Sequence, residues 1–143
     1  MDYQKLAHEL MQKMVSIHKA KHIKNIEDDI RGEVFVLYYI NQKSTGEVLP
    51  SELSAATGIS TSRIALTLNS LEKKALISRS IDVSDRRRIL VKLTQKGKEA
   101  AQQQINKILA DITNMLTLLG EQDAKEYTRI MGKIADAMLQ LNN

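Results

Sequence analysis

Two short segments of alternating apolar and polar residues constrain the fold most, because they interrupt a chain that otherwise follows helical spacing. Residues 77–81 and, less strictly, 89–93 alternate in this way, which is typical of half-buried strands. The polar, charged loop 82–88 joins them, so the sequence predicts a β-hairpin. The 143 residues include one proline and six glycines, and so few helix breakers favour long helices elsewhere. The predicted fold class is mainly α with a small β-hairpin.

A helix, a tight turn and a second helix precede the hairpin. The first of these helices opens at Pro50 and ends at Gly58, where glycine suits a left-handed cap. The second is capped by Ser60 or Thr61 and carries apolar residues at spacings of four and three. This order predicts a winged helix-turn-helix over residues 28–98.

Long amphipathic helices flank this core at both ends of the chain. The first spans about residues 2–23, and Asp28 or Asp29 is expected to cap the next helix. Apolar stripes of this length are more easily buried against a twin subunit than within one chain. Residues 1–24 and 99–143 are therefore predicted to form the helical dimerisation region of a homodimer, with an intramolecular helical pair as the alternative. The whole chain, 1–143, is expected to be a single domain.

Positive charge is concentrated in one segment of the chain. The net charge is +4, but residues 71–98 contain nine basic and three acidic residues, a local net charge of +6 that leaves −2 for the rest. A localised basic stripe is typical of nucleic-acid binding, and a solvated basic face is the alternative.

The outward face of the second helix is rich in hydroxyl groups and carries no acid before Glu72. Such a face near a helix N-terminus suits phosphates, and its small apolar groups suit a thymine methyl group. An ordinary polar helix face is the alternative. The predicted DNA contacts of this helix are Ser60, Thr61, Ser62, Arg63, Ala65, Leu66, Thr67, Lys73 and Lys74.

Three consecutive arginines, Arg86, Arg87 and Arg88, lie at the tip of the predicted hairpin. They cannot all point inward, so at least one projects into solvent, and arginine fits phosphates and narrow minor grooves. Asp82 and Asp85 are the predicted partners that hold the loop in shape. The alternative is that all three arginines form surface salt bridges, each of which contributes little.

Residues 85–97 resemble the wing and following helix start of the MarR family of winged helix-turn-helix transcription regulators. That family's pattern is Asp-Arg-Arg, a few residues, then Val-x-Leu-Thr-x-x-Gly, and here it ends at Gly97. Residues 71–77 are similar to the family's Leu-Glu-Lys-Lys-Gly-Leu-Ile, with Ala75 in place of glycine. A turn less left-handed than usual is therefore expected at Ala75. The resemblance covers almost the whole chain.

The resemblance implies a homodimer that binds pseudo-palindromic double-stranded DNA, mostly as a repressor. It also implies that a small aromatic or anionic molecule releases the DNA. By position, Arg87 corresponds to the family's minor-groove wing arginine. Many members carry Thr-Arg where this chain has Ala65-Leu66, so their base contacts do not transfer. The alternative function is a winged-helix protein-interaction module, an antirepressor that does not bind DNA.

Histidines and tyrosines supply the candidates for an effector pocket, namely His18, His22 and Tyr38. His18 and His22 share a face of the predicted first helix, but a transition-metal site needs a third ligand, so no metal or cofactor is predicted. No nucleophile–base pair, phosphate loop or catalytic carboxylate pair is recognisable, so no enzyme is expected. A cytoplasmic protein is expected because the sequence shows no signal peptide and no membrane span.

Overall fold

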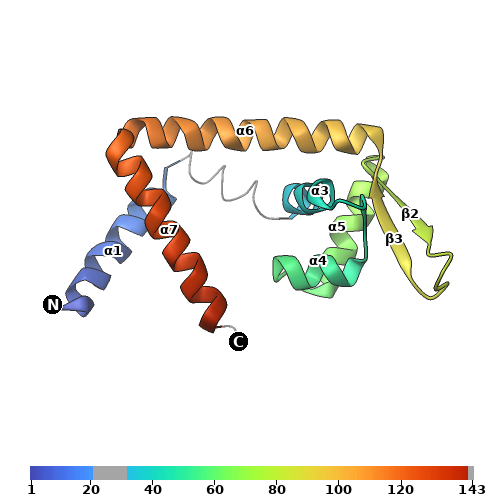
Figure 1. Ribbon diagram of the computed structural model, residues 1–143, viewed down its shortest axis with the longest axis horizontal. Coiled ribbons are helices and arrows are strands. Elements are labelled where there is room, and N and C mark those ends of the chain that lie inside the picture. The colour runs from blue at the N-terminus through green and yellow to red at the C-terminus, as the bar shows by residue number, and fades with distance from the viewer. Residues whose placement is uncertain (21–31, 142–143) are drawn as a thin grey trace. The chain divides into compact units, whose positions relative to one another are not determined.

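The computed structural model describes residues 1–20 and 32–141, which contain six helices and three strands (Figure 1). The chain divides into two compact units, Met1–Asn106 and Lys107–Asn143, and α6 runs through the boundary. The elements are α1 (Tyr3–His18), α3 (Glu33–Gln42), β1 (Glu47–Val48), α4 (Pro50–Thr57), α5 (Thr61–Lys73), β2 (Ile77–Ile81), β3 (Ile89–Leu93), α6 (Gln95–Leu119) and α7 (Glu121–Leu141).

Helix α1 is shorter than its apolar stripe predicts. The Asp2 carboxylate accepts a hydrogen bond from the backbone N–H of Lys5 at 3.1 Å and so caps the helix. The helix ends at His18, five residues before the predicted end, and Lys19 is its C-terminal cap. The predicted cap residues Asp28 and Asp29 lie outside the described residues.

Helix α3 begins later than the sequence predicts. Its N-terminal cap is Gly32, and no side chain caps it, so the expectation of an aspartate cap is wrong. The backbone at Gly32 has φ +74°, a conformation that glycine adopts without the steric cost of a Cβ atom.

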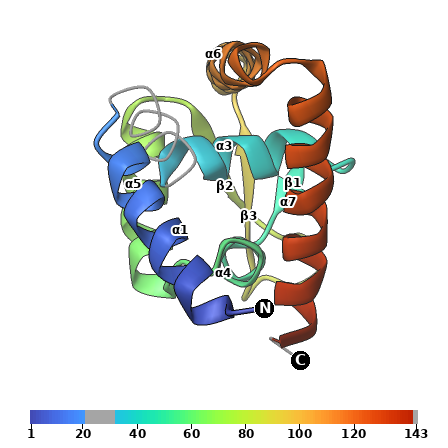
Figure 2. The same cartoon turned by 90° about the vertical axis from the view of Figure 1, so that its left-hand side faces the viewer.

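Helices α3, α4 and α5 pack beside the hairpin around one aliphatic core (Figure 2). The turn between α4 and α5 is left-handed at Gly58, as predicted, with φ +71°. The Ser54 hydroxyl donates to the carbonyl of Ile59 at 2.7 Å, and the N–H of Ile59 donates to the Thr57 hydroxyl at 3.1 Å. These bonds fix the turn, and the turn sets the direction in which α5 leaves it. The core residues are Val36, Leu37, Ile40, Val48, Leu53, Ile64, Leu68, Leu71, Ile77, Val91 and Ala101.

The sheet has three antiparallel strands in the order β1-β3-β2. Strands β2 and β3 have the predicted bounds, and their register pairs Ile77 with Leu93 and Ile81 with Ile89. The short strand β1 adds a third strand by pairing Val48 with Val91. The fold class predicted from the sequence, mainly α with a small hairpin, is confirmed.

The turn after α5 is left-handed, contrary to the expectation for Ala75. Ala75 has φ +60°, and the N–H of Leu76 donates to the carbonyl of Leu71 at 2.9 Å, which closes a Schellman-type cap. The Thr94 side chain donates to the Ala75 carbonyl at 2.6 Å, and its backbone N–H donates to the Leu76 carbonyl at 3.0 Å. These bonds from the start of α6 hold the turn in shape even without a glycine at position 75.

The unit Lys107–Asn143 contains the end of α6 and helix α7. Gly120, with φ +85°, separates the two helices. Within its described length, α7 buries none of its residues. Its apolar row therefore faces outward in the single chain.

Candidate nucleic-acid interface

Helix α5 has a buried row and an opposite, outward row. Ile64, Leu68 and Leu71 are buried against the core. At 3.6 residues per turn, Ser62, Leu66 and Lys73 lie on the opposite side, and all three are exposed. Leu66 is the apolar one of the three, and 69% of its surface is exposed.

The N-terminal end of α5 is exposed and free of acidic side chains. Ser60 caps it, because its hydroxyl accepts a hydrogen bond from the N–H of Arg63 at 3.3 Å. Thr61, Ser62, Arg63 and Ala65 are exposed, whereas Thr67 is half-buried at the edge of this face. Such an end presents backbone N–H groups and hydroxyls to an anion.

One flank of α5 is tied to helix α3 through Glu33. The Glu33 carboxylate accepts a hydrogen bond from the Ser70 hydroxyl at 2.5 Å and forms an ion pair with Lys74 at 2.7 Å. Partial burial raises the pKa of Glu33, but the hydrogen bonds from Lys74 and Ser70 outweigh it and leave the pKa below its ordinary value. Lys74, a predicted DNA contact, therefore has its charge balanced within the protein.

The other flank of α5 is tied to strand β2 through Arg79. Its Nη2 atom donates to the Asn69 side-chain oxygen at 2.9 Å, and its Nε atom lies 3.5 Å from a carboxylate oxygen of Glu72. Arg79 thereby counters the charge of Glu72, the first acid along α5. Both flanks are thus tied in the second half of α5, and the row through Leu66 faces outward between them.

The wing is the loop 82–88 between β2 and β3, and its tip holds Arg87 in an exposed position. Its side chain is 91% exposed, yet its Nε atom donates to the Asp85 carboxylate at 3.2 Å. The backbone N–H of Arg87 donates to the same oxygen at 3.1 Å. The pair engages Nε, so within the part of the chain that the structure describes the two terminal guanidinium nitrogens stay available to an anion.

Asp82 closes the other side of the wing loop. Its carboxylate accepts hydrogen bonds from the hydroxyl and the backbone N–H of Ser84 at 2.7 and 2.9 Å. It also lies 3.8 Å from Nε of Arg88. The two bonds from Ser84, followed by the charge of Arg88, keep the pKa of Asp82 below its ordinary value. Arg86 is exposed, and no ion pair to it occurs within residues 1–20 and 32–141.

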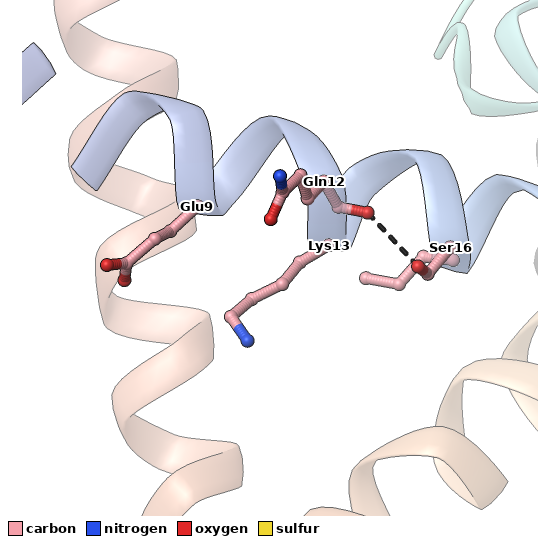
Figure 3. Close-up of a pocket in the computed structure, with 5 residues that line it drawn as sticks. Glu9, Gln12, Lys13 and Ser16 are labelled. Carbon is pink, nitrogen blue, oxygen red and sulfur yellow. Dashed lines mark hydrogen bonds between the residues drawn. The ribbon is translucent and has the colours of Figure 1, made fainter. Parts of the chain in front are cut away.

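Two of the three candidate effector residues lie within the described structure, on different helices. His18 ends α1, His22 lies outside the described residues, and Tyr38 is exposed on α3 with its ring centroid 6.5 Å from that of Phe35. The described residues that line a shallow pocket beside α1 all belong to this helix (Figure 3). Figure 3 labels Glu9, Gln12, Lys13 and Ser16, and Ile17 also lines the pocket.

Metal-binding clusters and membrane-spanning helices are both absent from the described residues. Residues 1–20 and 32–141 hold no group of three or more His, Cys, Asp or Glu side chains placed to bind a metal ion. No helix in the same ranges has the length and hydropathy needed to cross a membrane.

The sequence does not identify the residues that orient α5. Glu33 lies 41 positions from Lys74, so sequence spacing gives no signal for that pair. Arg79 stands out in the sequence only as a part of the basic segment. It lies two residues after the buried Ile77 and therefore shares its face of β2, which is a signal for a side chain turned toward the body of the protein.

Comparison with known proteins places the chain in a family. The model of the winged helix DNA-binding domain family matches residues 33–112. The HTH-type transcriptional regulator YwhA of Bacillus subtilis (strain 168) is 29% identical over 115 residues, which are 80% of this chain and 77% of that protein. The regulator YwaE of the same organism, like YwhA called uncharacterized, is 29% identical over 91 residues, or 64% of this chain. The match spans about half, 53%, of the length of YwaE.

A solved structure agrees over the whole fold. Streptococcus pneumoniae FabT, crystallised in complex with DNA, superposes with a TM-score of 0.69 and 20% identity, covering 98% of this chain and 99% of FabT. At that identity the likeness shows the fold alone. The family model matches more than half of the chain and agrees with the helix-turn-helix, the wing and the start of α6. The chain therefore belongs to the winged helix DNA-binding domain family, and its relatives are transcription regulators.

Proposed function

We propose that this chain is a MarR-type transcription regulator that binds double-stranded DNA with sequence specificity, as a homodimer on a pseudo-palindromic operator. Helix α5 enters the major groove, which is about 12 Å wide and admits a helix. The wing, residues 82–88, reaches the adjacent minor groove. The observation that carries the proposal is an exposed, acid-free N-terminal half of α5 in the same domain as an arginine, Arg87, that Asp85 holds in an exposed position.

The proposed contacts divide by chemistry. Ser60, Thr61 and Lys73 lie where hydroxyls and an ammonium group bind phosphates. Arg63 suits a guanine edge, and Arg87 suits a narrow minor groove. Lys74 contacts DNA only if a phosphate competes with Glu33 for its ammonium group. The full proposed set is Ser60, Thr61, Ser62, Arg63, Ala65, Leu66, Thr67, Lys73, Lys74, Arg86, Arg87 and Arg88.

Exposed apolar rows on two helices support the homodimer. Leu6, Leu10 and Met14 lie on one face of α1 and are 45–60% exposed, and α1 buries none of its residues within the described chain. Helix α7 carries a similar row, including Ile134 and Met138. Monomeric proteins rarely expose large contiguous apolar patches, so a second copy of the chain is the partner that we propose for these rows.

Control by a small aromatic or anionic effector, and action as a repressor, stay predictions from the resemblance. Titration of phenolic acids into a protein–DNA complex tests the first of them. Release of DNA at micromolar to millimolar ligand would support it, and unchanged affinity across the series would leave the regulator without an effector of that class.

Selection from a random pool of duplexes tests the proposed function. We expect enrichment of an inverted repeat whose half-sites are centred about 10 base pairs apart or at a multiple of that spacing, because two-fold symmetry places the two recognition helices about one DNA turn apart. Sedimentation of the same sample should give a dimer, both free and bound. A monomer, or a pool without enrichment, would contradict the proposal.

A further inference from the structure

We infer that Leu66 is a specificity-determining residue that contacts the 5-methyl group of a thymine in the major groove. The inference rests on the proposed function, and it names the base that the centre of α5 recognises. It depends on where Leu66 lies on a helix whose rotation is fixed from both sides.

The first observation is the isolation of Leu66. It is the one large hydrophobic side chain of α5 among those exposed, at 69%, and it faces away from Ile64, Leu68 and Leu71. Single exposed leucines are common on protein surfaces, so exposure alone carries no argument. The position opposite the buried row is what makes this leucine the foremost apolar group of the helix.

The second observation is that both flanks of α5 are anchored. Glu33 of α3 binds Ser70 and Lys74 on one flank, and Arg79 of β2 binds Asn69 and Glu72 on the other. Rotation of α5 about its axis would break one set of bonds or the other. These four flank side chains are engaged with the protein, whereas Leu66 between them faces an approaching surface.

The neighbours of Leu66 favour DNA over an apolar protein surface. Ser62 and Lys73 lie on the same row, and Arg63 and Ala65 are exposed beside it. Hydroxyl and positively charged groups around one leucine match a groove bordered by phosphates. A protein-binding patch would need a contiguous apolar surface of a few hundred square ångströms, which one leucine does not supply.

The chemistry of the major groove then selects the base. The thymine 5-methyl group is the apolar feature of the base edges, whereas the other edges present hydrogen-bond donors and acceptors. A leucine placed against those polar groups would remove them from water without giving them a partner. Leu66 therefore favours a thymine in each half-site.

Replacement of thymine by deoxyuridine, which lacks only the methyl group, tests the inference. The operator selected by the wild-type protein is synthesised with deoxyuridine at one thymine position at a time, in both half-sites, and affinity is measured by fluorescence anisotropy. One methyl group contributes about 0.8 kcal/mol on burial, which is about fourfold in affinity, so we expect about a 15-fold loss when both half-sites carry the change. The loss should occur at one thymine position per half-site.

Variants of the protein assign that loss to Leu66. Leu66→Ala should bind the thymine and deoxyuridine operators with equal affinity at that position, and Leu66→Met should keep part of the difference. Val83→Ala is the control, because Val83 is an equally apolar, 93% exposed side chain of the wing, and this variant should keep the full deoxyuridine effect. Circular dichroism checks that each variant is folded.

Three results would overturn the inference. The first is a wild-type protein indifferent to deoxyuridine at every position, and the second is a Leu66→Ala variant that keeps the wild-type sensitivity. The third is a change in the oligomeric state of Leu66→Ala without DNA, which would place Leu66 in a protein interface. Failure of the proposed function is distinct, because the wild-type protein would then select no operator.

Discussion

Substitution of Gly97 by alanine is expected to destabilise the protein far more than the same change elsewhere in a helix. A Cβ atom on Gly97 would lie 1.9 Å from the carbonyl oxygen of Leu76, where ordinary contacts begin at 3.4 Å. That oxygen accepts the hydrogen bond from the backbone N–H of Thr94, so it cannot move without disturbing the turn after α5. This turn, between α5 and β2, determines where α5 ends and where the hairpin begins.

The magnitude follows from three contributions. Overpacking costs about 1–3 kcal/mol. Loss of the two hydrogen bonds that Thr94 makes to residues 75 and 76 costs about 1 kcal/mol each. Against these losses, alanine stabilises a helix by about 1 kcal/mol relative to glycine. The expected net loss in the free energy of unfolding for Gly97→Ala is about 3 kcal/mol.

Gly132 supplies a matched control. It lies inside α7 and off the apolar row of that helix, and a Cβ atom added to it would meet no other atom within 4 Å. Gly132→Ala should therefore stabilise the protein by about 1 kcal/mol. Urea denaturation followed by circular dichroism, at one protein concentration, measures both variants. If Gly97→Ala matched or exceeded the wild-type stability, the close approach of α6 to the turn would be refuted.

Three further predictions concern the turn, the α3–α5 pair and the dimer. Ala75→Gly should raise the free energy of unfolding by about 0.5–1 kcal/mol. The left-handed backbone costs alanine about 1–2 kcal/mol, and the larger entropy that glycine loses on folding offsets about 0.5–1 kcal/mol of the gain. An unchanged or lower urea midpoint would contradict this prediction. The pKa of Glu33 is lowered on folding, so its contribution to stability is present above about pH 4.5 and is lost as the pH falls through the lower folded value. Glu33→Gln should therefore be less stable than the wild-type protein at pH 7, and its free energy of unfolding should fall less steeply in acid. An unaltered pH profile would contradict the pairing with Lys74. Leu10→Glu should raise the dimer dissociation constant at least about tenfold in sedimentation equilibrium, because it places a charge in the apolar row of α1. Gln12→Glu, on the opposite side of α1, should leave the constant unchanged. Equal effects of the two variants would contradict the assignment of α1 to the dimer interface.

The local pattern of the sequence is enough to predict most of the fold. Alternation over residues 77–81 and 89–93 marks the strand bounds, because one face of the hairpin lies on the core and the other faces outward. Gly58 and Thr94 are recognisable as a cap and a helix start, since both act within three or four residues of their own position. Such local effects are the ones that a single sequence records.

Features that depend on distant contacts are missed or wrongly predicted. Ala75 adopts a left-handed backbone because Thr94 and the close packing at Gly97 hold the turn, and those residues follow it by about twenty positions. The pairing of Glu33 with Lys74 joins α3 to α5 across the core. Nothing in the local pattern indicates that a predicted DNA contact is neutralised by an acid from another helix.

The candidate interface is predictable by residue type and only partly by geometry. The sequence places three arginines at the wing tip, and only the family resemblance singles out Arg87 among them. The structure separates them: Arg87 is held by Asp85 with its guanidinium group exposed, Arg88 lies near Asp82, and Arg86 is exposed. Asp82 and Asp85 lie in the same loop as the arginines, and the conformation of that loop decides which arginine each carboxylate pairs with. Composition alone does not specify this conformation.

The salt dependence of operator binding by wild-type protein and Arg87→Ala tests the central claim most directly. We expect the wild-type association constant to fall steeply with salt. We expect Arg87→Ala to weaken binding at least about tenfold and to reduce the logarithmic slope by about 0.9 for each phosphate charge that Arg87 neutralises, about 1.8 for a dimer. Arg129→Ala is the control, because Arg129 is also an exposed arginine paired with a neighbouring acid, Glu126, but lies on α7, and it should leave both quantities unchanged. Equal affinity and slope for wild-type protein and Arg87→Ala would contradict the assignment of the wing to DNA.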